Sequence, residues 1–267
     1  MRSYRTFVER SAERLLQAEL SGLTESPLSA AGQLDTATAY KIQDEQFCYR
    51  LERGEHGVGI AVQPSIAPET SASQDPVTGW LTDAMVAPSG GRLPIDASQR
   101  TELSPQFAFV LGQTLEDRWL TAEAAGAAID RIYPALLVTR SRYAGHGAGP
   151  CDVIADNLSL SRYLVGGIGI APTAVELRLE ASLLEVNGTL VGHSTGASLG
   201  TPLRVLAAAI NSLIRRGHVL ERGWTILVGP VVPAIRPMPG DTVIASFTHL
   251  GSVAVTCHDE AIDLQPQ

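Results

Sequence analysis

The fold is decided by residues 175–217, which read VELRLEASLLEVNGTLVGHSTGASLGTPLRVLAAAINSLIRRG. Apolar residues alternate with polar or short ones over 175–183, which predicts a β-strand. Asn187-Gly188 then predicts a tight hairpin, because a type I′ turn needs positive φ at both central positions. From Pro202 the apolar residues recur at helical spacing, which predicts a helix. A hairpin that leads into a helix favours an antiparallel α+β fold over a parallel, doubly wound one.

The sequence on both sides of this stretch predicts further β-structure and two N-terminal helices. The helices are expected near residues 4–20 and 36–53, where apolar residues recur at helical spacing. We therefore expect a helical annex over residues 1–54 and a β-rich domain over residues 55–267. Further elements are predicted at residues 121–131 (a helix) and at 132–143, 225–228, 243–247 and 253–257 (strands).

Composition excludes several classes of protein. The 267 residues include 20 Lys+Arg and 28 Asp+Glu, a formal net charge of −8, with 5% aromatic residues. An acidic chain with no basic run longer than Arg215-Arg216 is not expected to bind nucleic acid. No apolar run suits a membrane span or a signal peptide, so we expect a cytoplasmic protein without membrane contact. The cysteines are far apart, which gives neither a zinc-ribbon pattern nor a disulfide framework.

One motif suggests a serine hydrolase. Residues 192–196 (GHSTG) match the G-x-S-x-G pattern of a nucleophile elbow, and Asp241 and His249 follow in the order that such an enzyme needs. That elbow is a tight turn from a parallel strand into a helix. Here the helix begins only after Gly200, and the preceding strand is half of a hairpin. We therefore interpret the motif as a loop of small residues.

Motifs spread over nearly the whole chain, each weak alone, together resemble those of one known family. The family is the 2-keto-4-pentenoate hydratase / 4-oxalocrotonate decarboxylase group, within the fumarylacetoacetate hydrolase superfamily. The matching stretches are, in chain order, 79–85 (GWLTDAM), 141–143 (SRY), 156–159 (DNLS), 196–202 (GASLGTP), 224–229 (WTILVG), 239–241 (PGD) and 250–253 (LGSV).

The resemblance implies a fold and a chemistry. The fold would be a mixed β-roll with an N-terminal helical annex and an active site in a cavity of the roll. The chemistry would be hydration or decarboxylation of a 2-oxo dienoate through an enolate. In the family a Mg²⁺ or Mn²⁺ ion, held by three carboxylates and assisted by a lysine, binds the keto-acid oxygens. Homo-oligomerisation is also expected from the resemblance alone.

The chain departs from the family at the positions that hold the metal. The family's Glu-x-Glu pair falls on Ser104 and Gln106, and its third glutamate falls on Leu137. An aspartate of the same motif falls on Arg140, and the lysine aligns with Ala61. Since a hard divalent cation needs several anionic oxygens, we expect no bound metal and no other cofactor.

These replacements predict an enzyme that has been repurposed. It would act without metal on an enolisable or polyene carbonyl compound or 2-oxo acid, in a lyase, isomerase or cyclase step, with a cyclase of secondary metabolism as one form of this prediction. Asp83 would be the general acid/base, and Arg140 would hold a carboxylate or an enolate oxygen. The expected substrate-binding residues are Ser104, Gln106, Leu137 and Ser141.

Three alternatives stay open. The chain could be a non-catalytic homologue that scaffolds an active partner. It could also be a conventional metal-dependent hydratase or decarboxylase, because a shift of two residues preserves strand face and would bring Glu102 to a ligand position. Finally, the two charged residues could be structural, with Asp83 capping a turn and Arg140 paired with Asp152 or Asp156.

Overall fold

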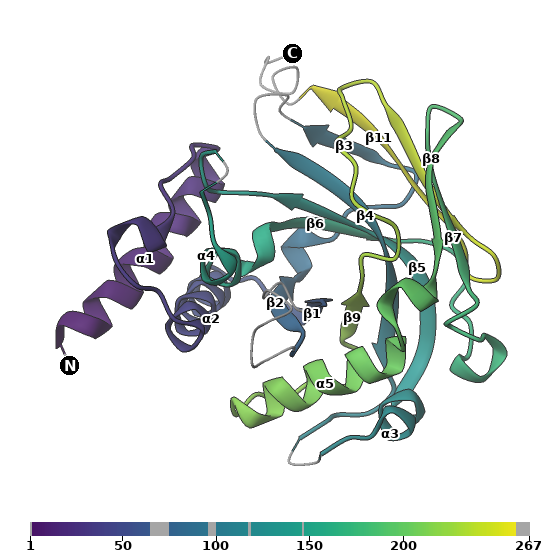
Figure 1. Cartoon of the computed structure of the whole chain (residues 1–267), viewed down its shortest axis with the longest axis horizontal. Coiled ribbons are helices and arrows are strands. Elements are labelled where there is room, and N and C mark those ends of the chain that lie inside the picture. Colours follow the sequence, from purple (N-terminus) through teal and green to yellow (C-terminus); the bar gives the residue numbers. More distant parts are fainter. Residues whose placement is uncertain (1, 65–74, 96–99, 117–118, 146, 260–267) are drawn as a thin grey trace.

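The computed structural model describes residues 2–64, 75–95, 100–116, 119–145 and 147–259 (Figure 1). The helices are α1 (Arg2–Ser21), α2 (Thr36–Glu52), α3 (Ala122–Ala127), α4 (Pro150–Ala155) and α5 (Pro202–Arg215). Short 3-10 turns are η1 (Leu28–Ala31), η2 (Asp83–Met85), η3 (Asn157–Ser159), η4 (Pro172–Ala174) and η5 (Gly196–Leu199). The strands are β1 (Gly57–Gln63), β2 (Val77–Thr82), β3 (Arg92–Ile95), β4 (Thr101–Leu111), β5 (Ile129–Arg140), β6 (Leu160–Val165), β7 (Ala181–Val186), β8 (Thr189–Thr195), β9 (Thr225–Val228), β10 (Thr242–Phe247) and β11 (Gly251–Asp259).

The larger sheet has six strands in the order β2-β1-β9-β4-β5-β6, of which only the β1–β9 pair is parallel. Its two edges meet, because Val86, just after β2, forms a bridge with Tyr163 on β6 and Ala87 N donates to the Tyr163 carbonyl. The sheet is therefore curled into a roll (Figure 1). This confirms the predicted α+β class.

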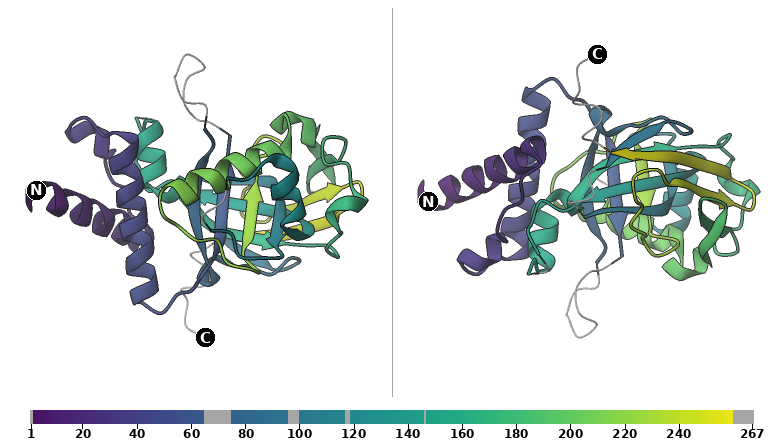
Figure 2. Two further views of the ribbon diagram at one scale, coloured as in Figure 1. Left: turned by 90° about the horizontal axis from the view of Figure 1, so that it is seen from below. Right: turned by 90° about the horizontal axis from the view of Figure 1, so that it is seen from above.

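The two faces of this sheet belong to two different cores. Phe107, Phe109 and Leu136 point from one face into a core shared with the smaller sheet, β3-β11-β10-β7-β8, and with α5. Ala108 and Leu137 point from the other face into a core shared with α1, α2 and α4. We call this second face the site face, because Ser104, Gln106 and Leu137 lie on it. Figure 2 shows α1, α2 and α4 grouped on one side of the strands.

Local sequence signals explain several element boundaries. Asp35 caps α2, since its carboxylate accepts from Thr38 N at 2.7 Å. Asn187 and Gly188 have φ of 51° and 76°, which confirms the hairpin between β7 and β8. Gly217, with φ of 85°, follows α5 in the left-handed conformation that ends helices. None of the helices in the described residues is long and apolar enough to cross a membrane.

Two predicted elements need correction. The alternating stretch 175–183 is not a strand along its length: β7 begins only at Ala181. Glu180 ends the preceding turn with its side chain buried, and its carboxylate accepts from the backbone N–H groups of His249 and Leu250. The helix predicted at 121–131 ends at Ala127, because residues 129–131 already belong to β5. The hairpin places Ser194 opposite Ser182, so the GHSTG stretch forms no elbow.

Candidate active site

The β4–β5 pairing brings three of the predicted site residues together. Ser104 lies directly opposite Leu137, and Gln106 lies two residues further along β4, opposite Ala135. Because strand side chains alternate, all three point to the site face. They are 6%, 1% and 1% exposed for Ser104, Gln106 and Leu137. The three positions on which the motifs place the family's metal ligands therefore lie close together on one face of the sheet.

The carboxamide of Gln106 is buried and only half satisfied. Its Nε2 donates to Ser104 Oγ at 2.9 Å, while its Oε1 has no hydrogen-bond partner among the described residues. Turning the amide over would exchange the two atoms and leave one polar atom unpaired either way. Gly229 makes room for this side chain, since a Cβ on Gly229 would lie 2.1 Å from Oε1. A buried polar atom without a partner costs about 1–3 kcal/mol.

Apolar residues continue the site face across β9 to β1. Ala108 on β4 pairs with Leu227 on β9, which pairs with Ala61 on β1. All three are fully buried, at 1% exposure or less. The position that aligns with the family's lysine therefore carries a methyl group and no charge.

A strained turn, η3, lies against this face. Asn157, Leu158 and Ser159 have φ of 50°, 55° and 57°, and the left-handed conformation costs a non-glycine residue roughly 1–2 kcal/mol. The Asn157 side chain holds the turn to β2, because it accepts from Trp80 N at 2.7 Å and donates to the Trp80 carbonyl at 2.9 Å. Such strain clusters at functional sites. The sequence signal that could have revealed it is the asparagine, which tolerates this conformation.

A cavity of about 300 Å³ opens beyond Ser104 and Leu137. Glu102 and Thr139 line it, and they pair two residues along the strands from Ser104 and Leu137, on the same face. Of the predicted residues, Ser141 lines this cavity, whereas Ser104, Gln106 and Leu137 do not. We call it the roll cavity. The other lining residues are Gln63, Arg100, Gly145, Ala148, Val153, Leu158 and Ser159.

Glu102 is the only carboxylate among the described residues that line the roll cavity. Its Oε1 lies 3.0 Å from Arg236 Nη2 and 4.0 Å from Arg100 Nη2. Two guanidinium groups thus already neutralise the negative charge of Glu102, on which a metal cation would depend. This geometry disfavours the register alternative in which Glu102 binds a metal.

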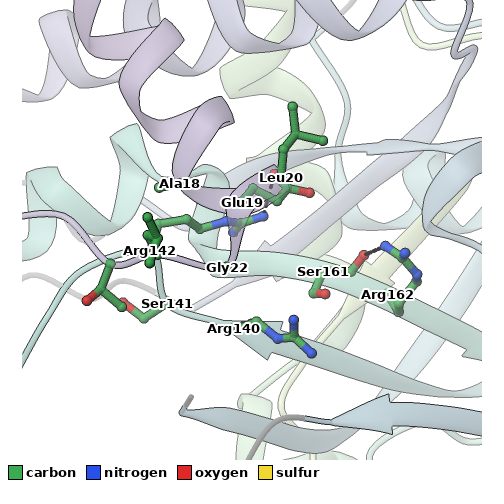
Figure 3. Close-up of a pocket in the computed structure, with 11 residues that line it drawn as sticks. Ala18, Glu19, Leu20, Gly22, Arg140, Ser141, Arg142, Ser161 and Arg162 are labelled. Atoms are coloured by element: carbon green, nitrogen blue, oxygen red, sulfur yellow. Dashed lines mark hydrogen bonds and ion pairs between the residues drawn. The ribbon is translucent and has the colours of Figure 1, made fainter. Parts of the chain in front are cut away.

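A buried ionic network holds the roll to the N-terminal helices (Figure 3). Arg142, with a side chain 5% exposed, pairs with Glu19 of α1 at 2.7 Å and with Asp156 at 3.6 Å. Glu19 also pairs with Arg50 of α2. Burial raises the pKa of Glu19, but Arg142 and Arg50 outweigh it and hold that pKa below its ordinary value. Burial raises the pKa of Asp156 to about 6, against the opposing charge of Arg142.

Comparison with curated proteins decides the family. The chain is 30% identical over 256 residues to 4-oxalocrotonate decarboxylase from Pseudomonas sp, an alignment that covers 95% of this chain and 99% of that relative. The chain belongs to the 2-keto-4-pentenoate hydratase / 4-oxalocrotonate decarboxylase family. It is also 29% identical over 249 residues to 2-keto-4-pentenoate hydratase from Paraburkholderia xenovorans (strain LB400), covering 92% and 93%. No family model matches the chain.

Solved structures agree with this family. 4-Oxalocrotonate decarboxylase from Pseudomonas putida G7, complexed with magnesium and adipate, superposes with a TM-score of 0.88 at 29% identity, over 95% of this chain and 98% of that one. Fumarylacetoacetate hydrolase from Exiguobacterium antarcticum shares the fold, with a TM-score of 0.56 at 17% identity over 77% and 76%. The resemblance inferred from the motifs is confirmed, and the chain is a hydratase- or decarboxylase-like enzyme of the fumarylacetoacetate hydrolase superfamily.

The donor set at β4 and β5 does not fit a divalent cation, although a solved family member is complexed with magnesium. Ser104 offers a hydroxyl and Gln106 a single amide oxygen, and Leu137 offers nothing. Mg²⁺ is ordinarily bound through carboxylates as well as neutral oxygens. Among the described residues, no group of three or more His, Cys, Asp or Glu side chains could hold a metal ion.

The hydrogen bonds of Asp83 are made with residues next to β1 and β2 and not with Ser104, Gln106 or Leu137. Its carboxylate accepts from the backbone N–H groups of His56 and Ala84, both at 2.9 Å, and lies 3.0 Å from His56 Nδ1. The side chain is 47% exposed. These contacts are those of a turn-capping carboxylate. Its electrostatic influence nevertheless reaches the site face, because its charge contributes, after burial, to raising the pKa of Tyr163. The general acid/base role stays a prediction.

Arg140 and Ser141 lie at the end of β5. Arg140 has the strand parity of Leu136, so it points away from the site face, and its Nη2 approaches the carbonyl of Pro94 on β3 at 3.4 Å. The structure therefore does not bring Arg140 to Gln106. Of the two carboxylates considered as structural partners of Arg140, Asp156 pairs with Arg142, and Asp152 accepts from Ser29 and Gly149. The substrate roles of Arg140 and Ser141 stay predictions.

Replacing Asp83 by alanine should separate its two roles. Hydrogen bonds from His56, first the backbone N–H and then the side chain, lower the pKa of Asp83 below its ordinary value of 3.8. Its stabilising effect is therefore present above pH 3.8 and is lost as the pH falls through the lower, folded-state pKa. We expect Asp83→Ala to lower the thermal midpoint at neutral pH, with the gap to wild type closing in acid. Loss of kcat by 10²–10⁴ with an unchanged midpoint would instead identify a general acid/base.

Proposed function

We propose that this chain is a metal-independent hydratase- or decarboxylase-like enzyme that acts on a small enolisable carbonyl compound of the 2-oxo acid type. The observation that carries this proposal is the buried carboxamide of Gln106, which has one polar atom without a partner and stands where the family resemblance expects a metal carboxylate. A site built from neutral hydrogen-bonding groups can stabilise an enolate without an ion.

The residues around Gln106 suggest how the substrate would be held. The substrate would enter through the roll cavity, where Ser141 and Ser159 offer hydroxyls and Arg100 offers a positive charge. Its carbonyl oxygen would approach the Ser104–Gln106 pair, which would reorient to donate to the developing enolate. Leu137 would form an apolar wall against the hydrocarbon part, which suits an isomerase or cyclase step on a polyene as well as a lyase step.

Proton transfer would fall to Glu102, since it lines the roll cavity and its two arginine partners fix its position. A carboxylate held in this way can accept a proton from carbon and return it elsewhere on the substrate. Asp83, the residue proposed from the sequence, remains the second candidate for this step. Homo-oligomerisation also stays a proposal, carried by the family alone.

Activity should not depend on a divalent metal. With a panel of 2-oxo dienoates as substrates, we expect turnover to be the same in EDTA and in Mg²⁺, because positions 104, 106 and 137 carry no carboxylate. Gln106→Ala should lower kcat by about 10²–10³, the usual loss for one donor to an enolate-type oxygen. Gln43→Ala is the matched control: another buried glutamine, it bonds to the carbonyls of Thr78 and Ile154, off the β4–β5 positions. Abolition of turnover by EDTA would overturn the proposal.

A second candidate is a scaffold without activity. It is favoured by the closure of the site, since Gln106 and Leu137 are each 1% exposed. If no 2-oxo compound is turned over, and the chain co-purifies stoichiometrically with an active hydratase or decarboxylase of the same family on co-expression, the scaffold would replace the enzyme as the conclusion.

A further inference from the structure

A second cavity lies between the end of α1 and strands β5 and β6, whereas the roll cavity includes a residue of β4 (Figure 3). Its volume is about 270 Å³. Three arginines line it, namely Arg140, Arg142 and Arg162, against one carboxylate, Glu19. We call it the annex cavity. It does not belong to the site proposed above, although Ser141 lines both cavities.

The charged residues of the annex cavity differ in how many ion pairs they make. Glu19 is already shared between Arg142 and Arg50, and Arg142 is held by Glu19 and Asp156. These side chains form a fixed wall. Arg162 differs, since it is exposed and its one hydrogen bond within the described residues runs from Nη1 to the neighbouring Ser161 carbonyl at 2.9 Å. Most of the five N–H donors of its guanidinium therefore face solvent.

Two serines also line the annex cavity, Ser141 and Ser161. Of these, Ser161 lies with Arg162 on β6. Figure 3 shows Arg140, Ser161 and Arg162 grouped on the β5–β6 side, with Glu19 and Arg142 towards α1. Two guanidinium groups with hydroxyls between strands form a donor set that matches the acceptor oxygens of an anion. This positive cavity is local, because the whole chain carries a formal net charge of −8.

We propose that the annex cavity binds a small oxyanion, a carboxylate or phosphate group, between Arg140 and Arg162. Arg162 would supply the mobile contact and Arg140 the fixed one, with the Ser161 hydroxyl donating to a remaining oxygen. Such a ligand would bridge β5 and β6 beneath the end of α1 and would stabilise the attachment of that helix. The proposal does not rest on the catalytic proposal above, because Arg162 and Ser161 do not line the roll cavity.

The test is titration calorimetry on the full chain with inorganic phosphate and, separately, with succinate, each at constant ionic strength against a sodium chloride blank. We expect saturable binding of at least one probe, and the probe that binds identifies the group. Arg162→Ala should weaken binding at least tenfold. Arg131→Ala is the matched control, because Arg131 is another exposed arginine of the roll with a single carbonyl partner, Gly169, and lies outside the cavity.

The outcomes separate clearly. Heat equal to the chloride blank for both probes would overturn the proposal, and so would binding that Arg162→Ala leaves unchanged. To exclude unfolding as the cause of a loss, the thermal midpoint of Arg162→Ala should match that of Arg131→Ala without ligand. Saturating phosphate or succinate should raise the midpoint of wild type and not that of Arg162→Ala.

Discussion

Replacing Arg142 by alanine is expected to lower the free energy of unfolding by about 3–5 kcal/mol, because it breaks a buried ion pair from one side only. Arg142 pairs with Glu19 and Asp156, and its Nη1 also donates to the Asp156 carbonyl at 3.4 Å. Asp156 is 1% exposed and would keep only its hydrogen bonds from Ser159 Oγ and the backbone N–H of residue 142. The same network holds α1 and α2, so they should loosen together.

Urea denaturation at neutral pH measures this loss, and limited proteolysis within α1 reports the loosening. Arg131→Ala should change the free energy of unfolding by no more than about 0.5 kcal/mol, as a surface substitution does. Lowering the pH should narrow the difference in the free energy of unfolding between Arg142→Ala and wild type. The reason is that protonated Asp156 is neutral and is no longer stabilised by the charge of Arg142. A loss below about 1 kcal/mol, or a loss that grows in acid, would show that the network contributes little.

This network also shows what the sequence could and could not predict. The SRY and DNLS stretches were among the motifs that carried the family resemblance, and Arg140, just before SRY, was predicted to be the functional arginine. Strand alternation gives Arg140 the parity of Leu136, which faces the core between the sheets. This orientation could be inferred only by knowing which face of the sheet packs on the helices, and the functional role of Arg140 stays a prediction. The partner of Arg142, Glu19, lies in a helix more than a hundred residues away, and no local pattern links the two.

Elements with strong local signals were predicted well. The hairpin at Asn187-Gly188 and helix α5 depend on turn and capping residues that act over a few positions. The strand predicted over 175–180 is absent although apolar and polar residues alternate there. Glu180 is instead buried against the loop at His249, a distant contact that the local pattern does not reveal. The motifs assigned Ser104 and Leu137 to the family's ligand positions, but that the two residues pair across β4 and β5 is a finding of the structure. The half-satisfied state of Gln106 depends on Gly229 and could not be inferred.

Introducing three carboxylates should create a metal site at three positions where the wild-type chain carries Ser104, Gln106 and Leu137. In the variant Ser104→Glu/Gln106→Glu/Leu137→Glu, the new side chains would face one another across β4 and β5, in the observed register. Three carboxylates buried together repel one another and lose hydration, so the metal-free variant should be less stable than wild type by several kcal/mol. Mn²⁺ would relieve that repulsion and supply the ion that oxygen ligands prefer.

The measurement is the thermal midpoint with and without Mn²⁺. At a Mn²⁺ concentration one hundred times its dissociation constant, the gain should be about 2.7 kcal/mol for the triple variant, while wild type should not respond. If the triple variant fails to fold, Ser104→Glu/Gln106→Glu, which keeps the buried Leu137, carries the same comparison with a smaller gain. A control substitution at Glu102 tests whether the ion is bound by residues 104, 106 and 137 or by Glu102. If residues 104, 106 and 137 are the ligands, adding Glu102→Gln to the triple variant should leave the Mn²⁺-dependent rise of the thermal midpoint unchanged. The contrary result is a thermal midpoint of the wild-type protein that rises with Mn²⁺, together with no such rise in Glu102→Gln. That result would contradict metal independence and would assign the ion to the roll cavity.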